Sequence, residues 1–293
     1  MSYAIKTLAL LFKILNMEYP VLISPDQALR IKMEDNAIIF DATIDKINQS
    51  IDNSMLELIP DSHFLDIEKD FSDHLSPLPH TMITDIKFTK EARKLGINND
   101  SVLIIYDRWG IYSSPRTWWM FRFMGFKKVY VLDGGFPAWK AAGLPISSEY
   151  AISENTVGNF TAIQQNDWYI SKDDLLHALD SPKINITDAR SGDRFNGTSA
   201  EPREGLRSGH IPGSHNIPFN QVLDGIKFKE KDYLERIFED KIKKENQNVF
   251  TCGSGITASI LALAAYHIGY KHISIFDGSW AQWGSDHNLP IAL

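Results

Sequence analysis

The chain has 293 residues, of which 43% are hydrophobic and 23% charged, and its formal net charge is -7. This composition is typical of a globular protein with one large or two ordinary domains, and its negative charge argues against nucleic acid as a partner. The single cysteine, Cys252, excludes an internal disulfide and a cysteine-rich zinc site. Such a cysteine content fits a reducing compartment, so we expect a cytoplasmic protein without a membrane partner.

A short apolar run, TLALLFKIL, occupies residues 7–15 near the N-terminus. Lys13 interrupts the run, and no cleavage site with small residues follows it. The run is also far shorter than the roughly 20 apolar residues that span a bilayer. We therefore expect residues 1–16 to be an extension, or to precede a true start at Met17, rather than to form a signal or an anchor.

The first half of the chain alternates β-rich runs with a helical pattern. SVLIIYD at residues 101–107 predicts a buried strand, and SSPRTWWMFRFMGF at residues 113–126 predicts the following helix. Pro115 suits the first turn of that helix and Gly125 suits its end. KKVYVLDGG at residues 127–135 predicts the next strand. A strand, a helix and a strand in this order indicate a parallel sheet flanked by helices.

The second half repeats the first in the same order, about half a chain later. The same alternation of strand, helix and strand runs from residue 248 to residue 279. The recurring segments are VLDGGFPAW (131–139) and IFDGSWAQW (275–283), LIPDSHF (58–64) and HIPGSHN (210–216), and IIFDAT (38–43) and NITDAR (185–190). Such repetition predicts a duplicated α/β domain. We place the first copy at residues 18–146, a polar linker at 147–167 and the second copy at 168–293.

Cys252 lies where a predicted strand ends and a helix begins. That end of the strands binds ligands in open α/β sheets, and the free N–H groups and dipole of the helix stabilise a thiolate. Gly253 and Gly255 allow a tight turn whose amides form an anion-binding nest, and Ser254 and Thr257 add hydroxyl donors. We predict a nucleophile here, because a cysteine that only fills the core needs no such nest.

Two other cysteine chemistries fit the loop poorly. A phosphatase of this type needs an arginine six residues after the cysteine, where this chain has Ala258, and no Lys or Arg occurs at residues 253–270. A papain-like protease needs a histidine positioned as the base, and His267 lies a full helix away. Both readings are therefore disfavoured.

The duplication and the loop CGSGIT at residues 252–257 resemble the two-domain rhodanese superfamily of sulfurtransferases, over residues 19–293. The loop is similar to the CG-S/T-G-V-T of members that use 3-mercaptopyruvate, whereas members that use thiosulfate carry basic residues directly after the cysteine. The resemblance implies tandem rhodanese-like domains, each a small parallel sheet flanked by helices. A thiosulfate sulfurtransferase, or a sulfur carrier or interaction protein without turnover, stays open as an alternative.

The resemblance also implies a reaction. Sulfane sulfur would pass from 3-mercaptopyruvate to a persulfide on Cys252, with release of pyruvate, and then to an acceptor thiol, cyanide or thioredoxin. No metal or organic cofactor is implied. The amides of residues 253–258 would cradle the persulfide, and the residues of the loop expected at the substrate are Gly253, Gly255, Ile256 and Thr257.

The loop at residues 188–219 resembles the superfamily's DAR…RF.G…EPR…GHIPG region. That resemblance implies that Arg194 and Arg203 bind the carboxylate and ketone of the donor, while Arg190 pairs with nearby acids. The chain departs from the pattern at Ser199 and Ala200, where an acidic residue and proline more often stand. The departure bears on the shape of the loop and leaves both arginines in place.

The first half contributes a further segment, LDIEKDFSDHLSPLPH at residues 65–80, which resembles one that crosses the domain interface. The resemblance assigns Glu68 and His80 to catalysis, together with Ser254; an interface ion pair is the alternative for Glu68. In the alignment of the two halves Asp107 stands opposite Cys252. An aspartate cannot carry sulfane sulfur, so the first domain is expected to be catalytically silent.

Overall fold

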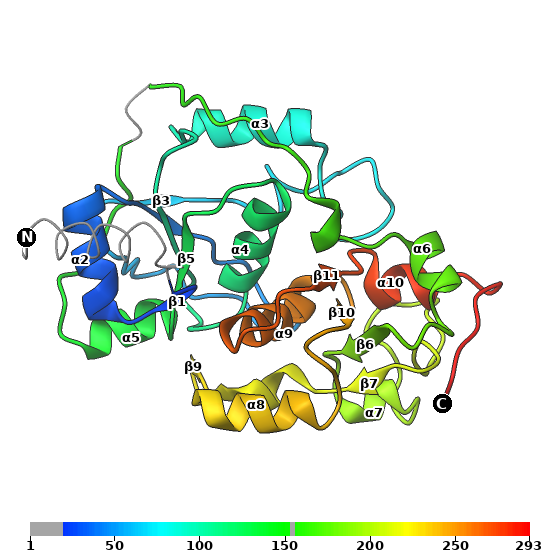
Figure 1. The fold of residues 1–293 in the computed structure, drawn as a ribbon. Helices are drawn as coiled ribbons and strands as arrows, with labels where there is room; N and C mark the ends of the chain where they lie inside the picture. Colours follow the sequence, from blue (N-terminus) through cyan, green and yellow to red (C-terminus); the bar gives the residue numbers. More distant parts are fainter. Residues whose placement is uncertain (1–19, 153–155) are drawn as a thin grey trace, which may run out of the picture.

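The computed structural model describes residues 20–152 and 156–293, which form two α/β domains side by side (Figure 1). Each domain is built on its own parallel sheet. The expectation for residues 1–16 falls outside the described residues. Within the described ranges, none of the helices has the length and apolar character needed to cross a membrane.

The first domain contains a five-stranded sheet in the order β1-β5-β4-β2-β3, with every neighbouring pair parallel. Its strands are β1 (Leu22–Ile23), β2 (Ile38–Asp41), β3 (Ser62–Phe64), β4 (Leu103–Tyr106) and β5 (Val129–Leu132). Its helices are α2 (Pro25–Asp35), α3 (Asp85–Lys94), α4 (Ser114–Phe123) and α5 (Gly135–Ala141). All four residues of β4 are buried, as expected for a parallel strand covered on both faces.

Local sequence explains where the central helix of this domain begins and ends. Pro115 occupies the first turn of α4, where its missing N–H costs no hydrogen bond. Gly125 follows the last turn with φ +86°, a left-handed conformation that glycine adopts without strain. The predicted strand, helix and strand are thus confirmed as β4, α4 and β5, each somewhat shorter than predicted.

The second domain contains a parallel sheet in the order β11-β10-β6-β7, which matches the order β5-β4-β2-β3 of the first. The tandem repeat predicted from sequence is therefore confirmed. The strands are β6 (Ile184–Asp188), β7 (His215–Asn216), β10 (Gln247–Thr251) and β11 (Ile273–Ile275), and a hairpin is formed by β8 (Leu223–Asp224) and β9 (Lys227–Phe228). The helices are α6 (Lys172–His177), α7 (Gly192–Phe195), α8 (Lys231–Glu239), α9 (Ile256–His267) and α10 (Ser279–Trp283), with short 3₁₀ turns at Asn166–Trp168 and Phe219–Val222.

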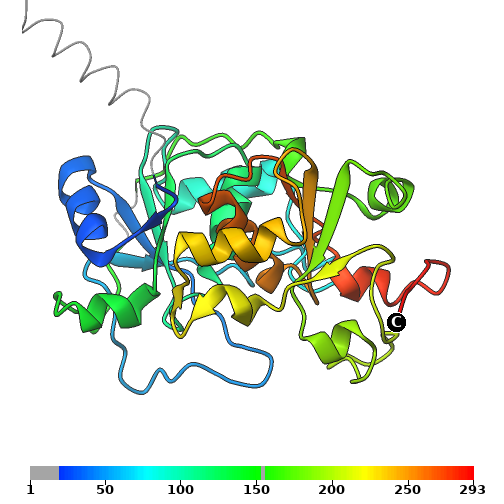
Figure 2. The same cartoon turned by 60° about the horizontal axis from the view of Figure 1, so that its bottom comes forward.

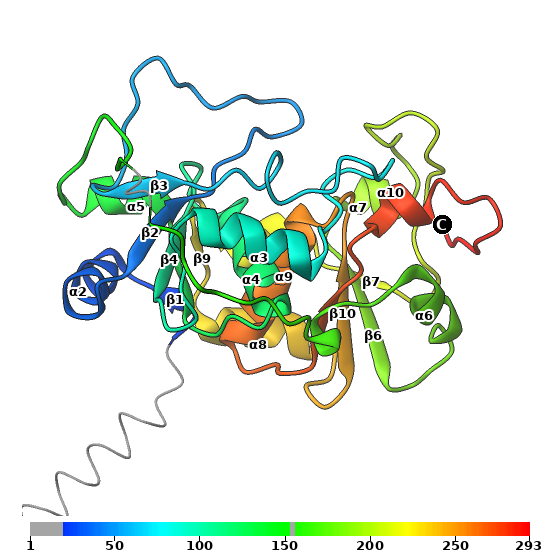
Figure 3. The same cartoon turned by 90° about the horizontal axis from the view of Figure 1, so that it is seen from above.

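Helices α4 and α9 pack against each other between the two sheets (Figures 1 and 3). A helix that is apolar on all sides must be covered on all sides, and α9 is buried from Ala258 to Ala265. One hydrophobic core includes Trp118 and Phe121 of α4 together with Ile260 and Leu263 of α9. This shared core fixes one domain against the other, so the first domain can supply side chains to a site in the second.

The segment predicted as the linker, residues 147–167, crosses the first domain and is anchored there. Its described part includes Phe160, which is 3% exposed and whose ring lies 5.3 Å from that of Phe126 and 6.3 Å from that of Phe88. Ser147 pairs with Leu58 through an antiparallel bridge. Backbone and side-chain hydrogen bonds add to this anchor, among them those from Arg93 to the Phe160 carbonyl and from Ala162 N–H to Thr89. The polar composition of the segment did not indicate these contacts.

The hairpin β8–β9 of the second domain reaches back to the first domain, and it is coloured yellow in Figure 2. The backbone N–H of Phe228 donates to the Asp133 carboxylate at 3.0 Å. Ile226 at the tip covers Gly110, where an added Cβ would lie 2.7 Å from the Cβ of Ile226. The hairpin therefore closes the loop of the first domain that contains Asp107.

Candidate active site

Cys252 directly follows β10, and α9 begins four residues later at Ile256, as the sequence predicted. The turn between them depends on Gly255, which has φ +84° and whose N–H donates to Cys252 Sγ at 3.1 Å. A Cβ at Gly255 would lie 2.8 Å from Nη1 of Arg116, so both the backbone angle and the close neighbour require glycine. The sulfur, which belongs to a 2% exposed residue, is thus held beside the first turn of α9.

Helix α10 holds the other side of this turn. The N–H of Cys252 donates to Ser279 Oγ at 3.2 Å, and Trp280 N–H donates to the carbonyl of Cys252 at 2.9 Å. The carbonyl of Gly253 accepts from Ala281 N–H at 3.0 Å. These bonds fix the backbone of the turn, and the first-turn N–H groups of α9, which lack carbonyl partners within their own helix, can bind an anion.

A cleft of about 630 Å³ opens above Cys252 between the two domains. Most of the predicted site residues line it; they are Glu68, His80, Arg194, Arg203, Cys252, Gly253, Ser254, Ile256 and Thr257. Gly255 lies behind the cleft, against Arg116 and Asp277. The cleft therefore brings together residues that are far apart in the sequence and belong to both domains.

Two arginines approach the cysteine loop from the second domain. A Cβ added to Gly253 would lie 3.2 Å from Nη2 of Arg194 and 3.6 Å from Nη1 of Arg203. Arg194 also holds the buried Glu201 in a two-pronged contact, with nitrogen–oxygen distances of 3.1 and 2.5 Å. Arg203, in contrast, has no carboxylate within ion-pair distance among residues 20–152 and 156–293. An anion placed between Gly253 and Arg203 would supply that charge.

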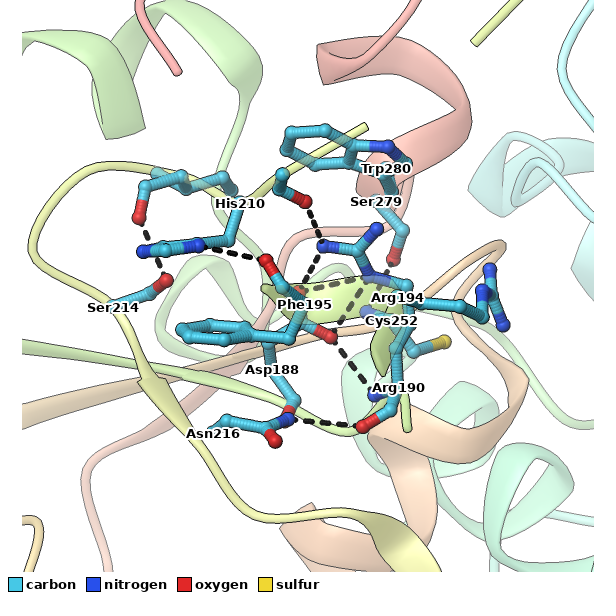
Figure 4. A network of polar contacts seen from close by, with 12 residues as sticks. Asp188, Arg190, Arg194, Phe195, His210, Ser214, Asn216, Cys252, Ser279 and Trp280 are labelled. Carbon is cyan, nitrogen blue, oxygen red and sulfur yellow. Dashed lines mark hydrogen bonds and ion pairs between the residues drawn. The ribbon is translucent and has the colours of Figure 1, made fainter. Parts of the chain in front are cut away.

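Arg190 belongs to the cleft lining, but its guanidinium is buried and paired with acids, as expected from sequence (Figure 4). Its guanidinium binds both oxygens of Asp188 and donates to Glu201 Oε1 at 2.8 Å. It also lies 4.3 Å from the ring centroid of Trp280, on the helix that holds the Cys252 backbone. The buried Glu201 therefore joins Arg190 to Arg194, and fixes the orientation of the latter.

His80 and Glu68 come from the first domain. His80 Nδ1 and Glu68 Oε1 lie 3.9 Å apart, beyond hydrogen-bond distance. Burial, followed by the charges of Arg116 and Arg203, lowers the pKa of His80 to about 4. His80 is thus neutral at pH 7, and its contact with Glu68 is not an ion pair there. Burial, followed by the charge of Asp66, raises the pKa of Glu68, which is half-exposed.

Arg116 is a residue of the site region that sequence reasoning missed. It rises from the first turn of α4, is 1% exposed, and joins Asp277 of the second domain through Nη2 at 2.6 Å. The same Nη2 donates to the carbonyl of His80 at 2.7 Å, while Nη1 lies against Gly255. Asp277 in turn accepts from Met82 N–H at 2.9 Å. The sequence did contain a signal for Arg116, namely a charged residue within the otherwise largely apolar stretch PRTWWMF.

Tyr112 and Lys46 were also missed, and both line the cleft. Burial, followed by the negative charge of Cys252, raises the pKa of Tyr112 to about 12, so its hydroxyl keeps its proton. The ammonium group of Lys46 lies 5.1 Å from the ring centroid of Tyr112. Tyr112 belongs to the loop of the first domain that corresponds to the Cys252 loop. No local pattern pointed to either residue, because their partners lie far away in the chain.

In the first domain Asp107 follows β4 as Cys252 follows β10, and its carboxylate occupies the nest of amides. Asp107 Oδ2 accepts from the N–H groups of Tyr112, Ser113 and Ser114 at 2.8 to 3.1 Å. Oδ1 accepts from Trp109 N–H at 3.1 Å. The first-domain loop therefore has neither a sulfur nucleophile nor a free anion site. Its aspartate acts as a cap at the beginning of α4.

Comparisons with known proteins agree with this architecture. The rhodanese-like domain family matches the chain twice, at residues 24–142 and 171–286. The 3-mercaptopyruvate sulfurtransferase of Rattus norvegicus is 40% identical over 230 residues, which are 77% of this chain and 76% of the rat protein. The mitochondrial thiosulfate/3-mercaptopyruvate sulfurtransferase 1 of Arabidopsis thaliana is 36% identical over 254 residues, covering 80% of this chain and 67% of that protein.

A solved structure extends the likeness to the arrangement of both domains. The crystal structure of SseA from Escherichia coli matches with a TM-score of 0.78 and 33% identity, over 89% of this chain and 98% of SseA. The duplicated parallel sheet, the cysteine loop and these matches lead to one conclusion. The chain belongs to the rhodanese family, among its two-domain sulfurtransferases.

Proposed function

We propose that the chain is a 3-mercaptopyruvate sulfurtransferase that forms a persulfide on Cys252 and releases pyruvate. The observation that carries the proposal is the approach of Arg194 and Arg203 to Gly253, directly beside the sulfur. A small substrate with a carboxylate and a ketone can contact both guanidinium groups while its own sulfur meets Cys252 Sγ.

In the first half-reaction the Cys252 thiolate attacks the sulfur of 3-mercaptopyruvate. A sulfur–sulfur bond forms, the carbon–sulfur bond breaks, and its electron pair leaves on carbon as the enolate of pyruvate. Negative charge then gathers on the ketone oxygen, so a guanidinium there stabilises the leaving group more than the bound substrate. The enolate takes up one proton to become pyruvate, and the outer sulfur stays on Cys252 next to the amides of α9.

We assign the proton to a relay that includes Ser254 and draws on Glu68 and His80. Ser254 belongs to the loop itself and lines the cleft. Burial, followed by the charge of Asp66, raises the pKa of Glu68, and this direction favours a carboxyl group that donates a proton. His80 is neutral at pH 7 and serves as a hydrogen-bonding group in this proposal, rather than as a cation.

In the second half-reaction an acceptor removes the outer sulfur and restores the Cys252 thiolate. The acceptor in our proposal is a small thiol, cyanide or the exposed thiol of a protein such as thioredoxin. The nucleophile must remain reduced between turnovers, which is consistent with a reducing compartment such as the cytoplasm.

Thiosulfate is a second candidate donor. The unpaired charge of Arg203 favours a dianion, whereas the neutral Gly253 and Ser254 that follow the cysteine favour a singly charged donor. We rank 3-mercaptopyruvate first because its ketone uses the second arginine. We rank the function of a sulfur carrier without turnover below both enzyme activities, because such a carrier would not need two arginines beside the sulfur.

Mass spectrometry after incubation with 3-mercaptopyruvate tests the proposal. We expect one added sulfur on the peptide that contains Cys252, together with one equivalent of pyruvate in the absence of an acceptor. Cys252→Ser is the control and should show neither. Wild-type protein that releases no pyruvate and gains no sulfur would contradict the assignment, and sulfur gained only from thiosulfate would favour the second candidate.

A further inference from the structure

One wall of the cleft carries an ammonium group that the reaction described above does not use. Lys46 lies in the loop that follows β2, which projects from the first domain in Figure 3, and it lines the same cleft as Cys252. The backbone around it is held in a tight turn, because Lys46 and Gln49 exchange two hydrogen bonds of 2.9 and 3.1 Å. The Asp45 carboxylate closes the turn by accepting from Ile51 N–H at 2.9 Å.

Two aromatic rings from the first-domain loop that contains Asp107 contact the ammonium group of Lys46. Lys46 Nζ lies 4.2 Å from the ring centroid of Trp109 and 5.1 Å from that of Tyr112. Trp109 is itself fixed, since its indole N–H donates to the carbonyl of Ile44 at 2.8 Å. Ring faces attract a cation without neutralising it. Burial lowers the pKa of Lys46, against the opposing charge of Asp107, which indicates partial loss of hydration.

The other charges of the cleft leave Lys46 without an acidic partner. Two carboxylates, Asp45 and Glu68, line the cleft, but neither comes within ion-pair distance of Lys46 Nζ in the described part of the chain. Arg194 is already bound to Glu201. The unpaired cations of the described cleft are therefore Arg203 on the second-domain wall and Lys46 on the first-domain wall. A half-hydrated cation without a counter-ion favours an anionic ligand.

We infer that Lys46, seated on Trp109 and Tyr112, is the binding site for the charge of the sulfur acceptor and selects thiols that carry a carboxylate. The inference rests on the proposed function. Once sulfur sits on Cys252, its attacker must approach in line with the sulfur–sulfur bond, from the open side of the cleft. The acceptor then lies in the cleft that Lys46 lines from the first domain, whereas Arg194 and Arg203 line it from the second.

The transfer step balances without any further reagent. The acceptor thiolate attacks the outer sulfur of the persulfide, a new sulfur–sulfur bond forms, and the bond to Cys252 Sγ breaks. The electron pair of that bond returns to Cys252 as thiolate, and the acceptor leaves as a persulfide that carries one added sulfur. Lys46 holds the acceptor's carboxylate throughout and exchanges no proton.

Two acceptors that differ mainly in charge provide the test, namely 3-mercaptopropionate and 2-mercaptoethanol, with rates expressed per thiolate. In Lys46→Met we expect kcat/KM for 3-mercaptopropionate to fall about five- to tenfold, on the scale of one lost ionic contact, and that for 2-mercaptoethanol to change less than about twofold. Lys46→Arg should retain most of the preference. The ratio of the kcat/KM values for the two acceptors, measured on one variant, does not depend on the fraction of that protein that is folded.

Single-turnover release of pyruvate separates this inference from the proposed function. Lys46→Met should release pyruvate at the wild-type rate, because the donor uses the opposite wall, and Lys90→Met on the exposed side of α3 should leave both measurements unchanged. An equal loss of kcat/KM for both acceptors, or a slower pyruvate release in Lys46→Met alone, would refute the acceptor site. Neither result would contradict the proposed sulfur transfer. A wild-type protein without pyruvate release would overturn both proposals.

Discussion

Replacing Arg116 by methionine should destabilise the protein strongly, because it breaks an ion pair buried between the domains. Arg116 and Asp277 are 1% and 6% exposed in their side chains, and they lie 2.6 Å apart. Removal of one member of a buried pair leaves the other charge uncompensated and costs about 3–5 kcal/mol. The total free energy of unfolding of a typical domain is only about 5–15 kcal/mol. We therefore expect Arg116→Met to lose a large part of the free energy of unfolding.

A surface pair of the same length provides the control. Lys94 and Glu91 are also 2.6 Å apart, but the side chain of Lys94 is 57% exposed. Lys94→Met should cost about 0–1 kcal/mol, as exposed pairs do. Urea unfolding followed by tryptophan fluorescence measures both variants, and the chain has seven tryptophans to report it. The two pairs share the same nitrogen–oxygen distance and differ in burial, in residue type and in the further bond that Arg116 donates to the His80 carbonyl.

The double variant Arg116→Met/Asp277→Asn tests the cause. Asparagine keeps an oxygen that can accept from Met82 N–H, which now donates to Asp277 at 2.9 Å, and it removes the stranded charge. We expect the double variant to be more stable than Arg116→Met, so the two effects should not add. A cost below about 1 kcal/mol for Arg116→Met, or strictly additive effects, would refute the account of this interface as a buried charge pair.

Three further predictions concern the proposed donor site and its surroundings. Arg194→Ala should weaken kcat/KM for 3-mercaptopyruvate by about 2–4 kcal/mol. Arg194→Lys should be nearly as damaging, because lysine lacks the forked guanidinium that contacts both oxygens of Glu201. Near-normal kinetics in the alanine variant would remove Arg194 from the site. Gly253→Arg with Ser254→Lys should move the donor preference towards thiosulfate and slow 3-mercaptopyruvate, because a side chain at residue 253 enters the space beside Arg194; an unchanged ratio of the two donors would contradict this. His80 has a pKa of about 4 in the folded state against an ordinary value of 6.5, so the unfolded chain binds the extra proton first and stability should fall as the pH drops from 6.5 to 4. His80→Asn, which tolerates the φ of +56° at this position, should flatten that pH dependence of the unfolding free energy, and an equal slope in both proteins would count against a buried neutral His80.

Much of the fold and of the cysteine loop was accessible from sequence because their determinants are local. Pro115 and Gly125 mark the limits of α4, and the buried run before Cys252 forms β10. Gly255 marks the left-handed turn in which its own N–H meets the sulfur. Each of these signals operates within a few residues. The repeat of whole segments then extended the local predictions to two sheets with the same strand order.

Several contacts around the site were not accessible from the sequence, because no local pattern indicates which residues meet. Arg116 and Asp277 belong to different domains and meet only after both have folded. Lys46 and Tyr112 belong to the same domain, but they meet across a loop whose conformation no periodicity describes. The motif that indicated Arg194 also contains Glu201, but it did not indicate that Glu201 is buried and already paired with Arg194. Tertiary packing decides such pairings, and a single sequence does not record it.

The two loops show how one structural unit supports two roles. Both follow a central strand, both turn at a glycine with positive φ, Gly110 or Gly255, and in both a backbone N–H near the start of the helix donates to the side chain that follows the strand. In the second domain that group is the sulfur of Cys252, which we propose to accept and release a further sulfur atom. In the first it is the carboxylate of Asp107, which is permanently attached and leaves no amide for a substrate. The carboxylate binds the N–H groups of the loop at fixed distances, and the same loop contributes Tyr112 to the cleft that Cys252 also lines. We therefore propose that the copy without a cysteine serves as one wall of the site that the other copy forms.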